Sequence, residues 1–455
     1  MTLSNAILCI LFTTLVASYG WGMRGALIGG EKGAMLPGAF IGLVLTHFSG
    51  VYAYLAPVAA GLMGMTYGGI EPYGETIGLV LDNPHGHPKR IKGYIGLAFK
   101  GALWFSICGG FIAFSFSRKV YSLRDIQIFC VLIPLIQLIG YLIFNTPYNK
   151  EKGIYPKIRF SPTRREEWGS NLLLLIAMMA MAVIRNDSFA LLMMTFGFFF
   201  GVIGWAVAIK CFDITIFPMK NGKYLFGKLF TNHLIDGWKF MEFVLGAFGG
   251  FGLSLAFCIG FDYIEEYNSE AALNGVKFVD EKLDDIAPII CILCVAAVFI
   301  INYLSYICDK KNVNINSFVL DRIERIFYCV IPMVFVLWGQ GGSIKIMTAF
   351  MLVFVAVIKI LFDRFKKVNF VTLIISLAVI SVSFVYLVAD RVTPMEIIIA
   401  GTVPYVFGEL ACAVYRQVKK GEPIKTLFTK TSFATVFPAF VVMSAAIIII
   451  SAKIF

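Results

Sequence analysis

Long apolar runs recur along the whole chain, and polar residues gather in the short segments between them. A helix needs about 20 apolar residues to cross roughly 30 Å of hydrocarbon, so these runs are typical of membrane spans. Three of them are short for a full crossing and are candidates for half-helices or tilted partners of a broken pair, namely 34–48, 171–184 and 326–338. In all we predict fourteen spans, at 5–20, 34–48, 51–69, 94–116, 127–145, 171–184, 189–209, 240–261, 286–307, 326–338, 345–362, 370–388, 395–415 and 431–450.

Composition agrees with this pattern. Hydrophobic residues make up 59% and charged residues 15% of the 455 residues, which leaves too little polar surface to cover a water-soluble globule. The predicted fold is an all-α polytopic integral membrane protein, with residues 1–455 forming a single transmembrane domain. Within it we expect a polar, glycine-rich helical region at 1–116 and apolar C-terminal helices at 323–455. The first run lacks a basic leader and a small-residue cleavage site, which favours a retained span over a signal peptide.

Lysine and arginine are distributed unevenly between alternate loops. One set of loops contains 28 of these residues and the other contains 9, while Lys100 and Lys359 lie inside spans. The positive-inside rule places the richer set in the cytoplasm, so we predict a plasma (inner) membrane protein with both termini external. The segment 261–285 agrees, because it carries eight acidic residues against two lysines on the external side, whereas the basic loop 117–125 is an exception. Topology therefore explains the net charge of +11, and we predict no nucleic-acid partner.

Neither the cysteines nor the histidines predict a metal or cofactor site. The ten cysteines lie in or beside apolar runs, where we interpret them as small packing residues. The pair Cys291 and Cys294 has no second pair or histidine nearby. His85 and His87 fall in LDNPHGHPKR, residues 81–90, where proline and glycine favour a solvated cytoplasmic turn over metal binding or proton transfer.

The stretch RGALIGGEKG, residues 24–33, sets three charges among glycines at the start of an apolar run. Charged side chains at membrane depth cost roughly 2.5–3.5 kcal/mol each on insertion scales, so they face a cavity or one another. Glycines let backbones approach closely and leave N–H groups free to face a ligand. Two interpretations stay open. Arg24, Glu31 and Lys32 line a solute site, or they neutralise one another in a cytoplasmic turn.

Polar residues are concentrated between positions 21 and 100, whereas the spans after 326 are almost bare. This asymmetry favours a substrate site among the N-terminal helices. A second cluster, Asp236, Lys239 and Glu242, has a spacing that places neighbours on one helix face, where they line a cavity or pair internally. The candidate solute-binding residues are Trp21, Arg24, Glu31, Lys32, Glu71, Tyr73, Glu75 and Trp238. The candidates for ion coupling are Glu31, Glu71, Glu75, Asp236 and Glu242.

These residues predict a secondary active transporter of a small polar or anionic solute, coupled to H⁺ or Na⁺. Arg24 and the free N–H groups of broken helix ends would meet a carboxylate or hydroxyl groups, and the carboxylates would carry the coupling ion. Trp21, Tyr73 and Trp238 would stack on the solute. The expected partners are a small-molecule solute and the lipid bilayer.

The alternative is a membrane-embedded enzyme that acts on a lipid-linked or glycan substrate at the cytoplasmic face. In that case Glu71, Glu75, His85 and His87 would serve as acid, base or metal ligands. An enzyme turns over in detergent micelles, whereas transport needs a sealed compartment, so an assay in micelles separates the two.

Overall fold

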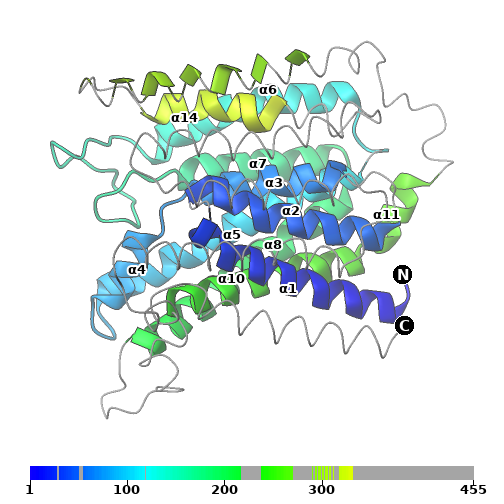
Figure 1. The fold of residues 1–455 in the computed structure, drawn as a ribbon, viewed down its shortest axis with the longest axis horizontal. Coiled ribbons are helices and arrows are strands. Elements are labelled where there is room, and N and C mark those ends of the chain that lie inside the picture. Colours follow the sequence, from blue (N-terminus) through cyan, green and yellow to red (C-terminus); the bar gives the residue numbers. More distant parts are fainter. Residues whose placement is uncertain are drawn as a thin grey trace, which may run out of the picture.

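The computed structural model describes residues 1–27, 30–50, 55–117, 119–216, 237–269 and, with interruptions, 289–331. Every regular element in these ranges is a helix, which confirms the predicted all-α class for this part of the chain (Figure 1). The spans predicted from 345 onward, and parts of those at 286–307 and 326–338, lie outside the described residues. The number fourteen therefore stays a prediction.

Long helices run side by side through the described bundle, as Figure 1 shows. They are α1 (Leu3–Leu27), α2 (Gly30–Ser49), α3 (Leu55–Gly69), α5 (Pro88–Phe116), α6 (Leu123–Phe144), α7 (Trp168–Ile184), α8 (Ser188–Ile216) and α10 (Gly237–Ile259). Shorter elements are α4 (Gly74–Leu81), α11 (Phe261–Asn268), α14 (Ser317–Arg325) and a π-helical turn at Ile326–Val330. Among the described residues, five stretches are long and apolar enough to cross a membrane, namely Leu3–Gly22, Pro88–Phe116, Arg124–Phe144, Ser188–Asp213 and Phe240–Ile259.

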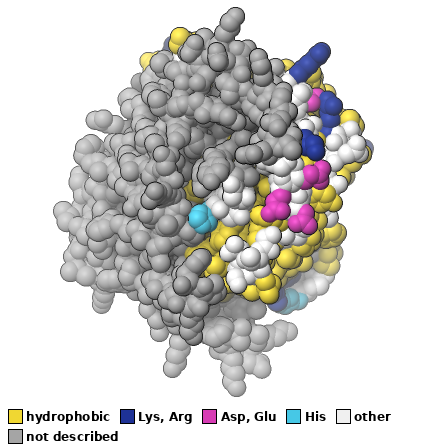
Figure 2. All heavy atoms as spheres, turned by 90° about the vertical axis from the view of Figure 1, so that its right-hand side faces the viewer, with side chains coloured by type: hydrophobic (Ala, Val, Ile, Leu, Met, Phe, Trp, Pro, Cys, Tyr) yellow, Lys and Arg dark blue, Asp and Glu magenta, His cyan; other side chains and the backbone are white. Residues whose placement is uncertain are grey.

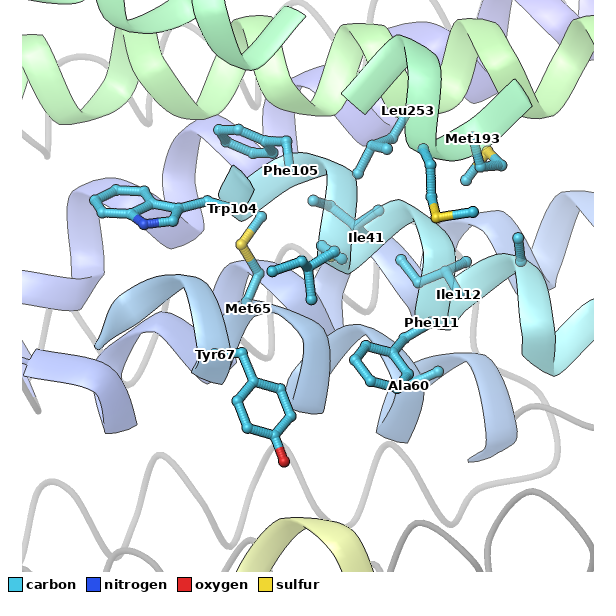
Figure 3. Packing of buried hydrophobic residues seen from close by; sticks show 14 of the residues in the cluster. Ile41, Ala60, Met65, Tyr67, Trp104, Phe105, Phe111, Ile112, Met193 and Leu253 are labelled. Atoms are coloured by element: carbon cyan, nitrogen blue, oxygen red, sulfur yellow. The ribbon is translucent and has the colours of Figure 1, made fainter. Parts of the chain in front are cut away.

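Helix α5 is the centre of the bundle. Every residue from Lys100 to Phe116 is buried, because α3, α4, α7 and α8 all pack against this helix. A helix that is apolar on all sides belongs in the interior of a helical bundle. Figure 3 shows Trp104, Phe105 and Phe111 of α5 among buried side chains from α2, α3, α8 and α10.

Reciprocal glycine contacts bring the helices close together. A Cβ atom on Gly101 of α5 would collide with the carbonyl oxygen of Gly201 of α8, and a Cβ atom on Gly201 would collide with that of Gly101. Gly38 of α2 and Gly61 of α3 face each other in the same way. Lipid supplies no hydrophobic driving force between helices, so such small-residue contacts gain their stability from close van der Waals packing.

The expected connector at 21–33 is largely helical, since α1 continues to Leu27 and α2 already begins at Gly30. Close packing accounts for one glycine of this segment: a Cβ atom on Gly22 would lie 2.5 Å from the ring of Phe243. Arg24 lies on α1 and Glu31 and Lys32 lie in the first turn of α2, but their side chains are outside the described part of the structure. Both interpretations of these three charges therefore stay open.

The segment 70–93, expected to be a loop, contains the short helix α4. Ile77 and Val80 of α4 are buried, and the guanidinium of Arg90 satisfies the end of the helix by donating to the carbonyl oxygens of Val80 (2.7 Å) and Asn83 (2.9 Å). Eight residues are too few to produce a span-length apolar run, which is why the pattern missed this helix.

Loops of opposite predicted sidedness lie at opposite ends of the bundle. Figure 1 places α4 and the connection from α6 to α7 at one end and α11 at the other. Helix α11 buries Phe261, Ile264 and Tyr267 and exposes its acidic residues. Figure 2, which faces this end, shows acidic side chains gathered there.

The positive-inside orientation can be tested with two single cysteines in a background that lacks the ten native ones. Glu151 and Ser269 are both exposed and lie on loops of opposite predicted sidedness. On intact cells, an impermeant maleimide should label Ser269→Cys and not Glu151→Cys, because the basic connection from α6 to α7 faces the cytoplasm. The reverse labelling pattern would invert the predicted topology.

The contact between α5 and α8 predicts that Gly101→Ala is destabilising. The added methyl group must push α8 away, and overpacking of this kind costs about 1–3 kcal/mol. The thermal unfolding midpoint of the purified protein in detergent should fall. Gly74→Ala is the matched control, because a Cβ atom at Gly74 would meet nothing within 4 Å. Equal midpoints for the two variants would contradict this account of the contact.

Candidate functional site

A lysine ammonium group lies inside the helical bundle. The side chain of Lys100 on α5 has no exposed surface. Its Nζ atom donates to the carbonyl oxygen of Pro72 at 2.7 Å, to Oγ1 of Thr76 at 3.0 Å and to Oε1 of Glu166 at 2.8 Å. An ammonium group has three N–H donors, and these three acceptors occupy all of them.

Glu71 is a second carboxylate beside the same lysine. It lies in the turn between α3 and α4, is fully buried, and has one carboxylate oxygen 3.9 Å from Nζ of Lys100. This distance is too long for a hydrogen bond. Neither carboxylate oxygen of Glu71 forms a hydrogen bond of ordinary length and angle to a described residue, although the main-chain N–H of Glu167 is near enough to lower its pKa.

The surroundings of Glu71 favour its protonated form. Burial raises the pKa of Glu71, since the charged form loses its hydration. The cation of Lys100 and the main-chain N–H of Glu167 oppose this shift, whereas the negative charges of the Glu166 and Glu167 side chains add to it. The net direction is upward, so the carboxyl group keeps its proton at a higher pH than an exposed glutamate.

A strap, defined here as residues 146–167 between α6 and α7, covers this end of the site. Besides Lys100, the Glu166 carboxylate accepts a hydrogen bond from the main-chain N–H of Phe160 (2.7 Å). The hydroxyl group of Ser161 lies 3.2 Å from that of Thr76, which also accepts from Lys100. Glu166 and Thr76 therefore connect the strap directly to the buried lysine.

Glu75 holds the other side of the strap. Its carboxylate accepts hydrogen bonds from the main-chain N–H and hydroxyl groups of Thr163 (2.8 and 2.7 Å) and from the main-chain N–H of Arg164 (3.0 Å). Burial alone would raise the pKa of Glu75, but these hydrogen bonds outweigh it and lower the pKa. Glu75 is therefore an ionised anchor for the strap, on the opposite side from the lysine group.

Glu167 joins the strap to α14. Its carboxylate pairs with Arg165 (3.0 Å), with Arg322 and with Arg325 (3.6 Å). Arg322 also donates to the side-chain oxygen of Gln137 on α6 (2.7 Å). Cations thus surround Glu167, whereas Glu71 faces a single cation.

An aromatic cluster lies next to the lysine group. The ring of Tyr73 packs against Trp104, Trp205 and Trp238 at centroid distances of 5.3–5.8 Å. Oε1 of the buried Glu242 accepts hydrogen bonds from the Tyr73 hydroxyl group (2.9 Å) and from Nε1 of Trp238 (3.0 Å). The predicted residues Tyr73, Trp238 and Glu242 are therefore in direct contact.

The predicted site residues fall into separate groups. Trp21 stacks on Trp104 at 5.4 Å and so joins the aromatic cluster, and Glu71 belongs to the lysine group. Glu75 binds the strap instead of facing either group. Four predicted positions, Arg24, Glu31, Lys32 and Asp236, lie outside the described side chains.

The histidine segment has a local structural role. His87 caps the start of α5 by accepting a hydrogen bond from the main-chain N–H of Lys89, and Pro88 occupies the first turn. His85 is exposed. Within the described residues, no group of three or more potential ligands is arranged to hold a metal ion.

Some of the most connected residues were not among the predicted site residues. The sequence pattern marked Lys100 only as a charge inside a span. Nothing in the local sequence around Glu166, Trp104 or Trp205 indicated a functional role. A lysine in an apolar run is itself a signal, because such a charge needs a partner in the bundle. Its partner Glu166 lies 66 residues away in a loop rich in other charges, so spacing could not identify it.

Comparison with known proteins adds no assignment: no family model, no curated protein and no solved structure matches this chain.

The raised pKa of Glu71 predicts a stability that depends on pH. In the folded state this group holds its proton above the pKa of about 4.3 that it has when unfolded. Its contribution to stability is complete below that value and is lost as pH rises through the raised folded pKa, by up to about 1.4 kcal/mol per pH unit.

Thermal unfolding in detergent tests this expectation. The midpoint of the wild-type protein should fall from acidic to alkaline pH relative to that of Glu71→Gln, which cannot ionise. Glu75→Gln is the control, because it removes a carboxylate whose pKa is lowered and should destabilise the protein at neutral and alkaline pH. Parallel curves for the wild type and Glu71→Gln would show that Glu71 does not titrate in this way.

Proposed function

We propose that this protein is a secondary active transporter of a small polar or anionic solute and that the proton is its coupling ion. The observation that carries the proposal is the buried carboxyl group of Glu71, which forms no hydrogen bond of ordinary length and angle to a described residue and lies 3.9 Å from the fully buried Lys100. This arrangement sits beside a helix that is apolar enough to span a membrane.

Stability alone does not explain such a group. Replacing a buried ion pair by well-packed apolar residues is often neutral or stabilising by roughly 1–4 kcal/mol. Ionisable residues inside membrane proteins mark ion pathways and proton relays. Ionisation of a further buried carboxyl group, that of Glu71, adds to this cost, which supports a role in binding and releasing a proton.

The charge around Glu71 supports H⁺ over Na⁺. One carboxylate suffices to bind a proton, whereas a hard metal cation is bound by several oxygen ligands. The charged group nearest to Glu71 is the ammonium of Lys100, which would repel a bound metal ion. Protonation of Glu71, in contrast, leaves a neutral pair of Lys100 and Glu166.

The solute would be bound by the aromatic cluster. Nε1 of Trp104 and Nε1 of Trp205 are buried and have no acceptor among the described residues, so both could donate to oxygen atoms of a solute. Tyr73 follows Pro72, whose carbonyl oxygen accepts from Lys100. One short segment, 71–76, therefore connects the proposed proton site with the proposed solute site.

Proteoliposomes that contain a pH-sensitive dye test this function. Under an imposed pH gradient, a panel of sugars, amino acids and carboxylic acids should include solutes that accelerate proton entry. Glu71→Gln should reduce this acceleration at least about tenfold. Exchange of the same labelled solute at equal concentrations should persist, because proton coupling and solute binding involve different residues.

The control is Glu151→Gln, an exposed position on the strap that should leave both activities unchanged. Proton-driven uptake that persists in Glu71→Gln would remove this residue from the coupling mechanism. Substrate turnover in detergent micelles, with no sealed compartment, would contradict transport and favour the enzyme alternative.

A further inference from the structure

We propose that Lys100 is a switch that exchanges its carboxylate partner between Glu166 and Glu71, and that this exchange releases the strap when Glu71 loses its proton. The inference rests on the proposed function in that it assigns a gating role to the same proton site. It is argued from the arrangement of hydrogen bonds around Nζ of Lys100.

The two carboxylates compete for one ammonium group. All three N–H donors of Lys100 are in use. The distance from Nζ to Oε1 of Glu166 is 2.8 Å, and the distance from Nζ to the nearer carboxylate oxygen of Glu71 is 3.9 Å. When Glu71 is protonated, Lys100 and Glu166 form a neutral pair. When Glu71 ionises and its proton passes to water, a fully buried anion needs a charge-assisted hydrogen bond. Lys100 can supply one only by giving up a present acceptor.

Two of the three acceptors of Lys100 hold the strap. Glu166 is part of the strap, and its other oxygen fixes the main chain at Phe160. Thr76 binds Ser161 of the strap. The third acceptor, Pro72, neighbours Glu71 in the chain and does not touch the strap. A shift of Lys100 toward Glu71 therefore weakens the strap's attachments at Glu166 and Thr76 and leaves those at Glu75 and Glu167.

The other charges around Glu71 allow this exchange. Lys100 faces it from α5, and Glu166 and Glu167 face it from the strap. Glu167 is held by Arg165, Arg322 and Arg325, so it does not compete for Lys100. The balance between Glu71 and Glu166 therefore decides where the ammonium group lies.

Accessibility of Ser161 reports the position of the strap, because this residue is buried against Thr76 while the exposed Glu151 lies elsewhere on the strap. The experiment uses full-length protein in detergent without native cysteines, carrying Ser161→Cys or, as reference, Glu151→Cys. The rate of maleimide labelling at position 161 is divided by that at position 151, and the same ratio measured in Glu71→Gln corrects for the effect of pH on the buried thiol. From about pH 6 to about pH 9 this ratio should rise about tenfold, whereas Glu71→Gln should keep it low throughout.

Glu166→Gln should give a high labelling ratio at both pH values, because it removes the negative charge that pairs Lys100 with the strap. A ratio that does not change with pH in the wild type, or that rises equally in Glu71→Gln, would overturn the switch. Hydrogen exchange of residues 156–167 in the protein with its native cysteines, corrected for intrinsic rates, gives the same readout if Ser161→Cys fails to fold. Labelling needs no solute, so a pH-dependent strap without proton-coupled transport would refute the proposed function and leave the switch intact.

Discussion

The ammonium group of Lys100 is the constraint on which this end of the bundle depends. Helix α5 is buried on every side at this position, so the charge can reach no water and needs protein acceptors. The chain supplies them from three places: a main-chain carbonyl at Pro72, where the helical path is interrupted between α3 and α4, a hydroxyl group on α4, and a carboxylate on the strap. This one cation is therefore bound by the break after α3, by the short helix α4 and by the strap.

Close helix packing makes such a site feasible. Gly101 directly follows Lys100 and lies against Gly201 of α8, so the two backbones meet beside the lysine with no side chain between them. Gly68, just before the break, is close to Trp104 in a similar way: a Cβ atom there would lie 2.8 Å from Cβ of Trp104. Contacts of this kind exclude solvent and lipid from the lysine group. They also hold the aromatic cluster against it.

The sequence predicted the helical class and most described spans, because span length and apolar pattern are local properties. It named Tyr73 and Trp238 as candidates for solute binding and Glu242 as a candidate for ion coupling, and these three are in contact. It could not assign Glu75 and Glu71 to different tasks, although they are four residues apart, because the partners of Glu75 come from the strap at 163–164. Long-range pairing of this kind depends on how the helices pack, which no local spacing encodes.

The number of carboxylates beside Lys100 distinguishes a switch from a structural ion pair. A structural pair needs one anion, and Glu166 alone would neutralise the lysine. With Glu71 added, the group is neutral only when it holds one proton, and it carries a net charge of −1 when that proton leaves. A buried group that must change charge has to rearrange its hydrogen bonds, because a rigid one would pay the full desolvation cost of the new anion. In the proposed switch, the two unequal distances from Nζ, 2.8 and 3.9 Å, are those of the protonated state, in which Glu166 holds the lysine and Glu71 is neutral.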